Sequence, residues 1–163
     1  MKSILFILLC MLGIACRQND LNYGTSTLNQ DSLNVALLNV DKSWSEVSLS
    51  KGYYHSRLDF ASDAAIEMMQ AAMPLNGKKA IEEYAATHSD SAFTMQWKPL
   101  KAEVAGSGDL GYTYGSWMMR MKTQNGKDTS LVGNYVTVWQ KQADGSWKYV
   151  VDGGNDTPEE VKE

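Results

Sequence analysis

The hydrophobic and polar positions of this chain follow two periods, and the change between them falls near residue 90. Upstream, apolar residues recur about every three to four positions, which predicts helices. From Phe93 onward, apolar and polar residues alternate, which predicts strands. Helices followed by a long antiparallel meander are typical of an α+β domain.

The upstream half predicts three helices. The first is capped by Asp31 or Ser32 and ends before Gly52. Its apolar stripe consists of Leu33, Leu37, Val40, Trp44 and Val47. The second covers residues 53–63, with Tyr54, Leu58 and Ala61 on one side. A short strand over 64–73 then leads to a third helix over 78–88, for which Asn76 is a candidate cap.

The downstream half predicts four strands, separated by the turn signals GSGD, QNGKD and ADG. They cover residues 93–105, 109–123, 129–142 and 146–154. Glycines inside these strands indicate bends. The sheet should therefore curl around the helices and leave a cavity at its open end.

The register of the last hairpin decides whether Asp152 faces that cavity. If Asp144–Gly145 form a two-residue turn, Thr137 faces Asp152 and the carboxyl is buried. If Ala143, Asp144 and Gly145 form a three-residue loop with Gly145 at a bulge, Thr137 faces Val151, and Asp152 lies on the opposite face. We favour the three-residue loop, because it is a common hairpin class.

The inward face then supplies the predicted pocket. Its lining residues are Trp44, Tyr54, Trp117, Tyr135, Thr137, Trp139, Tyr149 and Val151. Tyr112 and Tyr114 would lie on the outer face of the sheet. Exposed aromatic residues there suggest a partner surface, such as a homodimer interface; the alternative is a single-sided sheet with amphipathic tyrosines at its surface.

The N-terminus predicts an export signal. Lys2 precedes an apolar block over 4–12, and the segment is too short to span a bilayer as a mature helix. GIAC at its end resembles a bacterial lipobox, which would make Cys16 the lipidated residue; the alternative is a plain secreted protein in which Cys16 only happens to lie beside the cleavage site. We therefore expect a signal peptide over 1–15, a polar tether over 16–31, the domain over 32–157 and a tail over 158–163, in the bacterial cell envelope.

Replacing the predicted lipidation site tests this expectation. Cys16→Ser should release the protein from the membrane fraction or block its processing, because no other cysteine remains after residue 15. A variant that fractionates and migrates like the wild type would contradict the lipid anchor.

Three stretches carry a resemblance to a known family. AEVAGSGDLGYTYGSW and GNYVTVWQKQADGSWKYVVDGGNDTP, together with FASDAAIEMMQAAMPLNGKKAI, resemble the SnoaL-like and ketosteroid-isomerase-like branch of the nuclear transport factor 2 superfamily. The resemblance covers roughly residues 33–157. It implies a cone in which three helices pack into a strongly curved, mostly antiparallel sheet. Isomerases, cyclases, dehydratases, binding modules and association domains share this fold, so the fold alone does not identify the reaction.

Candidate catalytic groups are few. Ketosteroid-isomerase-like chemistry requires a carboxylate base, and a tyrosine with a protonated acid as oxyanion hole. The available acids are Asp59, Asp63, Glu67 and Asp152, and none matches that dyad residue by residue. His55 could reach the cavity as a base or hydrogen-bond donor, although a surface position is the simpler interpretation. Two distant histidines without a retained cysteine give no metal-ligand spacing.

The composition indicates which classes of partner the protein can bind. With 21% charged residues, a net charge of −4 and scattered basic positions, the chain shows no footprint for nucleic acid. No cofactor motif is present. We expect a membrane contact through the lipid only, and a small apolar or amphipathic ligand in the cone, without identified catalysis. The alternatives are an isomerase, cyclase or hydrolase using a buried acid and tyrosine, and a homodimeric association module.

Overall fold

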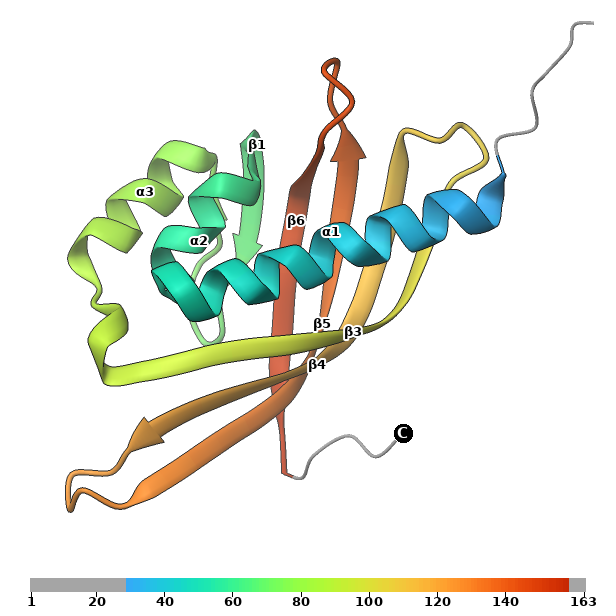
Figure 1. The fold of residues 1–163 in the computed structure, drawn as a ribbon. Coiled ribbons are helices and arrows are strands. Elements are labelled where there is room, and N and C mark those ends of the chain that lie inside the picture. The colour runs from blue at the N-terminus through green and yellow to red at the C-terminus, as the bar shows by residue number, and fades with distance from the viewer. Residues whose placement is uncertain (1–28, 159–163) are drawn as a thin grey trace, which may run out of the picture.

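The computed structural model describes residues 29–158. Three helices and a six-stranded, curved sheet form the α+β cone, which confirms the fold expected from the sequence (Figure 1). The elements are α1 (Gln30–Lys51), α2 (Tyr53–Phe60), β1 (Ala61–Met68), β2 (Leu75–Asn76), α3 (Lys78–Thr87), the short 3-10 helix η1 (Asp90–Ala92), β3 (Phe93–Val104), β4 (Leu110–Lys122), β5 (Asp128–Lys141) and β6 (Trp147–Thr157).

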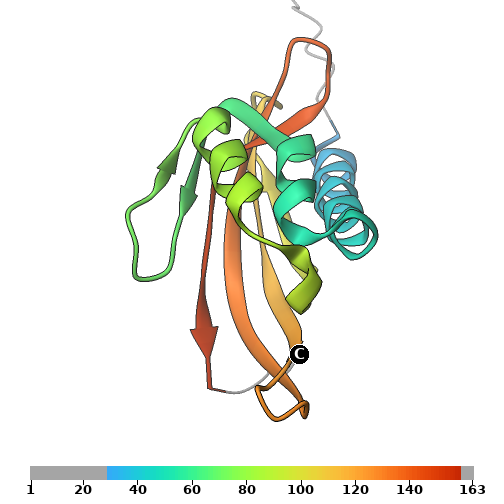
Figure 2. The ribbon, with the colours of Figure 1, turned by 90° about the vertical axis from the view of Figure 1, so that its left-hand side faces the viewer.

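The sheet is mixed. Its strand order is β2-β1-β6-β5-β4-β3, and every neighbouring pair is antiparallel except β1 and β6. Figure 2 shows α2 and α3 in front of the curved strands, with the β1–β2 hairpin at the flank. The parallel β1–β6 pair brings the first strand of the domain beside the last, so residues from both ends of the domain meet on the concave face.

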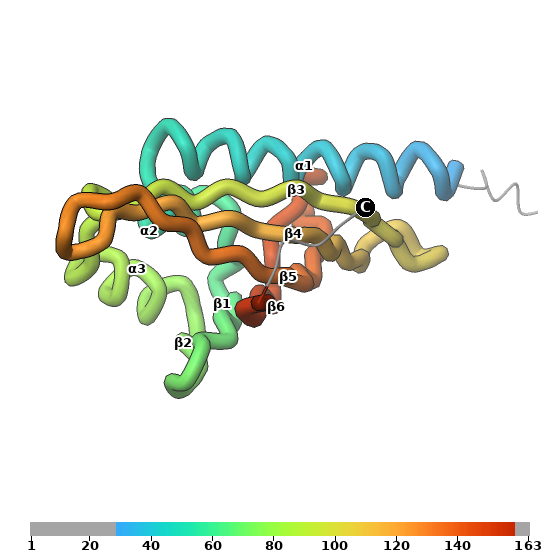
Figure 3. Tube along the Cα trace, turned by 90° about the horizontal axis from the view of Figure 1, so that it is seen from below, coloured from blue at the N-terminus to red at the C-terminus, as the bar shows by residue number. Residues whose placement is uncertain are grey.

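Helix α1 covers the open edge of β3 (Figure 3). The Ser45 hydroxyl accepts a hydrogen bond from the Trp97 N–H and donates one to the Trp97 carbonyl, both at 2.8 Å. Ser48 donates to the Met95 carbonyl at 2.9 Å. An exposed edge strand offers unpaired backbone groups to other chains. The buried serines of α1 satisfy these groups, which explains why polar residues lie on the inner side of this helix.

The core is built around the indole of Trp44. Its ring stacks on Tyr149 at 4.9 Å between centroids and meets the edge of Trp97 at 5.0 Å. Its Nε1–H donates to Ser56 at 3.2 Å. Aromatic pairs in these geometries add to the free energy gained from area burial alone. The rings therefore fix α1 and α2 against β3 and β6.

Two predicted caps are wrong. Helix α1 starts at Gln30, and Asn29 is its N-cap: the Asn29 side chain accepts from the Ser32 N–H at 3.4 Å. Helix α3 follows Gly77, which makes no side-chain cap. Glycine suits this position because its φ is +85°. The predicted signal peptide, Cys16 and most of the tether lie outside the described residues.

No helix among residues 29–158 is long and apolar enough to cross a membrane.

Candidate functional site

The β5–β6 hairpin combines the two registers that the sequence allowed. Gly145 has φ +85°, and Trp139 pairs with Tyr149, as the three-residue loop predicted. The register then shifts between Val138 and Trp139, which leaves Val150 as an extra residue in β6. Beyond this bulge Thr137 pairs with Asp152. The prediction that Asp152 lies off the cavity face is therefore wrong, because one extra residue returns its side chain to the other face.

Asp152 enters a small aromatic cavity inside the cone. The Thr137 hydroxyl donates to its carboxyl at 2.6 Å, the one hydrogen bond to that carboxyl within residues 29–158. The cavity has a volume of about 30 Å³, room for about one or two water molecules. Its lining consists of Trp44, Tyr53, Met95, Trp97, Trp117, Tyr135, Thr137 and Asp152.

Burial controls the acidity of Asp152. Loss of hydration is the largest cause and raises the pKa of this carboxyl from 3.8 to about 7. The hydrogen bond from Thr137 opposes the rise, the negative charges of Glu67 and Asp41 add to it, and the Arg57 cation lowers the pKa. A carboxyl with this pKa exchanges protons at neutral pH.

Glu67 is the strand neighbour of Asp152 but has a different environment. The two residues pair directly across β1 and β6. Glu67 is buried, and it accepts hydrogen bonds from the Arg57 guanidinium and from the Tyr149 hydroxyl, the latter at 2.6 Å. Burial raises its pKa, while Arg57 and Tyr149 lower it. Glu67 belongs to a buried ion pair and does not line the cavity.

Asp41 is a second interior acid that the sequence analysis missed. It is fully buried on α1. Its Oδ1 accepts from the Trp97 indole N–H and its Oδ2 accepts from the Tyr135 hydroxyl, both at 2.7 Å. Burial raises the pKa of Asp41 more than these hydrogen bonds lower it. The signal was its spacing, since Leu37, Asp41 and Trp44 fall on one face of the helix.

The structure places the predicted pocket residues in three environments. Trp44, Trp117, Tyr135 and Thr137 line the cavity. Trp139 and Tyr149 are fully buried beside it, as core. Val151 pairs with Val138 and does not line the cavity.

The predicted residues of α2 lie away from the cavity. Tyr53 lines the cavity in place of Tyr54, whose ring packs on Tyr84 and Phe93. His55 lies at the surface with 63% of its side chain exposed, and its Nδ1 lies 2.9 Å from Asp90 Oδ2. The geometry therefore gives His55 no contact with the candidate site.

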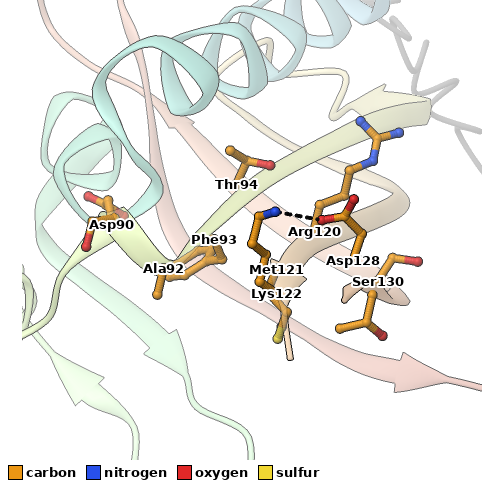
Figure 4. Close-up of a pocket in the computed structure, with 11 residues that line it drawn as sticks. Asp90, Ala92, Phe93, Thr94, Arg120, Met121, Lys122, Asp128 and Ser130 are labelled. Atoms are coloured by element: carbon orange, nitrogen blue, oxygen red, sulfur yellow. Dashed lines mark ion pairs between the residues drawn. The ribbon is translucent and has the colours of Figure 1, made fainter. Parts of the chain in front are cut away.

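A larger hollow lies at the open end of the cone (Figure 4). It is lined by η1, the start of β3, the end of β4 and the start of β5. It has a volume of about 960 Å³, and the ion pair between Lys122 and Asp128, at 3.5 Å, lies on its wall. Phe93 lines this hollow and meets the edge of the Tyr53 ring at 6.3 Å between centroids. Tyr53 also lines the inner cavity, so its contact with Phe93 joins the wall of the hollow to the wall of the cavity.

Within the described part of the chain, no group of three or more potential metal ligands converges. The chemistry that this arrangement offers is proton transfer by Asp152, with a hydroxyl donor beside it and aromatic walls around it.

Solved structures with similar folds were found, although no protein-family model and no curated protein matches the chain. A ketosteroid isomerase-like protein from Erwinia carotovora atroseptica superposes with a TM-score of 0.62 and 14% identity, over 76% of this chain and 96% of that chain. A nuclear transport factor 2-like superfamily protein from Salmonella enterica gives 0.60 and 14%, over 79% and 94%. The CaMKII hub of S. rosetta gives 0.62 and 14%, over 76% and 96%.

The chain therefore has the nuclear transport factor 2-like fold, as its sequence resemblance implied. At these identities the likeness establishes the fold alone.

Proposed function

We propose that the domain is an acid–base catalyst that moves a proton on a small, largely apolar carbonyl compound. The observation that carries this proposal is the Asp152 carboxyl, which lies among aromatic rings with Thr137 as its hydrogen-bond donor and has a pKa of about 7. A general base is most effective when its pKa lies near the working pH. The pairing of Thr137 with Asp152 thus favours the enzyme hypothesis over a simple binding module.

Asp152 acts as the base in this mechanism. Its carboxylate takes a proton from the carbon beside the carbonyl group, and the electrons of that C–H bond form the C=C bond of an enolate. The proton then returns from Asp152 to the same carbon or to a conjugated one. The second outcome is an isomerisation, and neither requires an oxidant or a further reactant.

Tyr135 stabilises the developing oxyanion. Burial raises the pKa of Tyr135 far above its usual value, so its hydroxyl keeps its proton. The Tyr135 hydroxyl donates to Asp41 Oδ2, while Asp41 Oδ1 accepts from the Trp97 indole N–H. In the mechanism this hydroxyl turns from Asp41 and donates its proton to a ligand oxygen in the cavity.

The substrate enters from the hollow at the open end of the cone. A volume of about 960 Å³ there suits a small molecule, whereas the inner cavity of about 30 Å³ admits only its reacting group after the walls move. Met95 lines the inner cavity, and a methionine side chain adapts readily to a ligand. The indoles around Asp152 favour a flat, apolar substrate.

Deuterium exchange of a model ketone tests this function. We expect the protein to accelerate exchange of the α-protons of 2-tetralone in D₂O, followed by NMR. Asp152→Asn should lower the enzyme-dependent rate by about 100-fold or more. Asp156→Asn is the matched control, because Asp156 is an exposed acid on the same strand that bonds Gln70 at 2.9 Å. Equal rates for wild type and Asp152→Asn would overturn the proposal.

We further propose that this catalyst is exported and lipid-anchored at Cys16 in a bacterial envelope. The short apolar segment after Lys2 and the GIAC sequence support this address. A tether between Cys16 and α1 would hold the domain at the membrane surface.

A second candidate function is association through the outer sheet face. Tyr114, Val136 and Met68 are exposed there and line a groove of about 510 Å³. Tyr114 pairs with Val136, and Val136 with Gly153, so the residues form a row across the sheet. Association domains among the solved structures share this fold, including that of the C. elegans CaMKII.

Light scattering tests this second function. If the outer face is an interface, the wild type should elute as a dimer, and Val136→Glu should give a monomer because a charge would be buried without a partner. A monomeric wild type at about 100 μM would contradict the association function, since that concentration exceeds typical dissociation constants.

A further inference from the structure

A buried cation lies behind the cavity, beside the two strand-paired acids. The Arg57 side chain is 1% exposed and contacts Glu67, whose side chain is 4% exposed. Three tyrosine rings surround the guanidinium: its carbon lies 5.1 Å from the ring centroid of Tyr53, 5.2 Å from that of Tyr54 and 5.5 Å from that of Tyr84. The cation is therefore enclosed by rings on one side and by a carboxylate on the other.

Two nitrogen groups of the Arg57 guanidinium could donate further hydrogen bonds. Its Nε and Nη2 are buried and have no hydrogen-bond partner within residues 29–158. An arginine keeps its charge in proteins, and a buried charge requires a counter-charge. Glu67 and Asp152 are both candidates for that role, because they pair directly across β1 and β6.

If Arg57, Glu67 and Asp152 were all ionised, the cluster would hold two negative charges and only one positive charge. Glu67 accepts hydrogen bonds at both oxygens, from Arg57 and Tyr149, and these contacts favour its carboxylate form against the burial that raises its pKa. One cation and one carboxylate then neutralise each other, and Asp152 is left without a counter-charge. Asp152 can therefore take up a proton in the interior, which an acid paired with Arg57 would not do.

We propose that Glu67 is a positioning residue. It pairs with Arg57 and neutralises its charge, and so leaves Asp152 free to take up and release a proton. This inference rests on the proposed function, in which Asp152 is the proton carrier. The charged and titratable groups that act on Asp152 come from every element packed around it: Asp41 of α1, Tyr53 and Arg57 of α2, Glu67 of β1, Tyr135 of β5 and Tyr149 of β6 itself. Arg57 is the one cation in this set.

Removing the Glu67 charge is the direct test. In Glu67→Gln, Asp152 is the one carboxylate within residues 29–158 that still acts on the Arg57 charge. The titration midpoint of Asp152, followed by carbon-13 NMR of its carboxyl, should fall by about 1 to 3 pH units. The pH profile of 2-tetralone exchange should move to lower pH with it. Asp63→Asn, an exposed acid on the same strand, should change neither.

Two further variants keep the test decisive if Glu67→Gln fails to fold. Arg57→Met combined with Glu67→Gln removes both charges, and a neutral replacement of a buried ion pair is commonly tolerated. Arg57→Met alone leaves the Glu67 carboxylate beside Asp152. We expect the Asp152 midpoint to be higher in the single Arg57→Met variant than in the double variant.

The outcomes separate the two proposals. A wild-type Asp152 that titrates near pH 4 would overturn the proposed function. A wild-type midpoint near pH 7 that does not move in Glu67→Gln, or equal midpoints in Arg57→Met and the double variant, would overturn only the role of Glu67.

Discussion

Asp152→Asn is expected to make the protein more stable above pH 7. The folded state raises the pKa of this carboxyl from 3.8 to about 7, because burial disfavours its charge. Below pH 4 the carboxyl is neutral in both folded and unfolded chains. Between about pH 4 and 7 the folded state holds a proton that the unfolded state has released, so the free energy of unfolding falls as pH rises. Above pH 7 the buried carboxylate is charged, and the free energy of unfolding stays lower than it was at pH 4.

The size of this effect follows from the pKa change. A rise of about 3 pH units corresponds to roughly 4 kcal/mol. An asparagine has the shape of the neutral acid and can still accept from Thr137. The gain in the variant should therefore grow from near zero at pH 4 to several kcal/mol at pH 8, measured by urea denaturation at each pH. A gain that is the same at both pH values, or a loss at pH 8, would contradict the burial of an ionising Asp152.

The same substitution should separate stability from function. We expect Asp152→Asn to be more stable at pH 8 and inactive in exchange, a combination common when a functional group that destabilises the fold is removed. Asp156→Asn should leave both properties unchanged, because this acid lies at the surface.

Trp44→Ala has the largest expected loss of stability. The ring is 2% exposed and packs on Tyr149, Trp97, Trp139 and Phe60. Truncation of a buried tryptophan costs about 3–5 kcal/mol, because it removes contacts and leaves a cavity. Urea denaturation near pH 6 measures the loss.

A matched truncation on the same helix calibrates this result. Leu49 is 51% exposed, and Leu49→Ala should change the free energy of unfolding by less than about 0.5 kcal/mol. A loss below about 1 kcal/mol for Trp44→Ala would contradict the packing of α1 against the sheet.

Local pattern was enough to predict the strands. Alternation and turn signals placed the four long strands close to their observed bounds, because the side-chain period of a strand is set by its backbone. The first residues of β1 were instead assigned to the second helix, because Ala61 has a high intrinsic helix propensity. Glycine-containing turns mark the strand ends in the sequence, whereas no such signal marks the change from helix to strand after Phe60.

The site depended on features that local pattern does not encode. The bulge at Val150 reverses the facing of Asp152, and no glycine or turn signal marks it. The pairing of Glu67 with Asp152 joins β1 to β6 across most of the domain. Asp41 lies at a helical spacing that otherwise holds core residues, and its role depends on Tyr135 and Trp97 from the sheet. Such long-range contacts follow from the tertiary fold.

The titration of Asp152 in the wild-type protein tests the account most directly. Carbon-13 NMR of aspartate carboxyls, with Asp152→Asn to assign the signal, gives its midpoint. A midpoint near pH 7 is the result that burial in the aromatic cavity predicts. A midpoint near pH 4, which is about the value of a solvated aspartate, would contradict the cavity as a site of proton transfer.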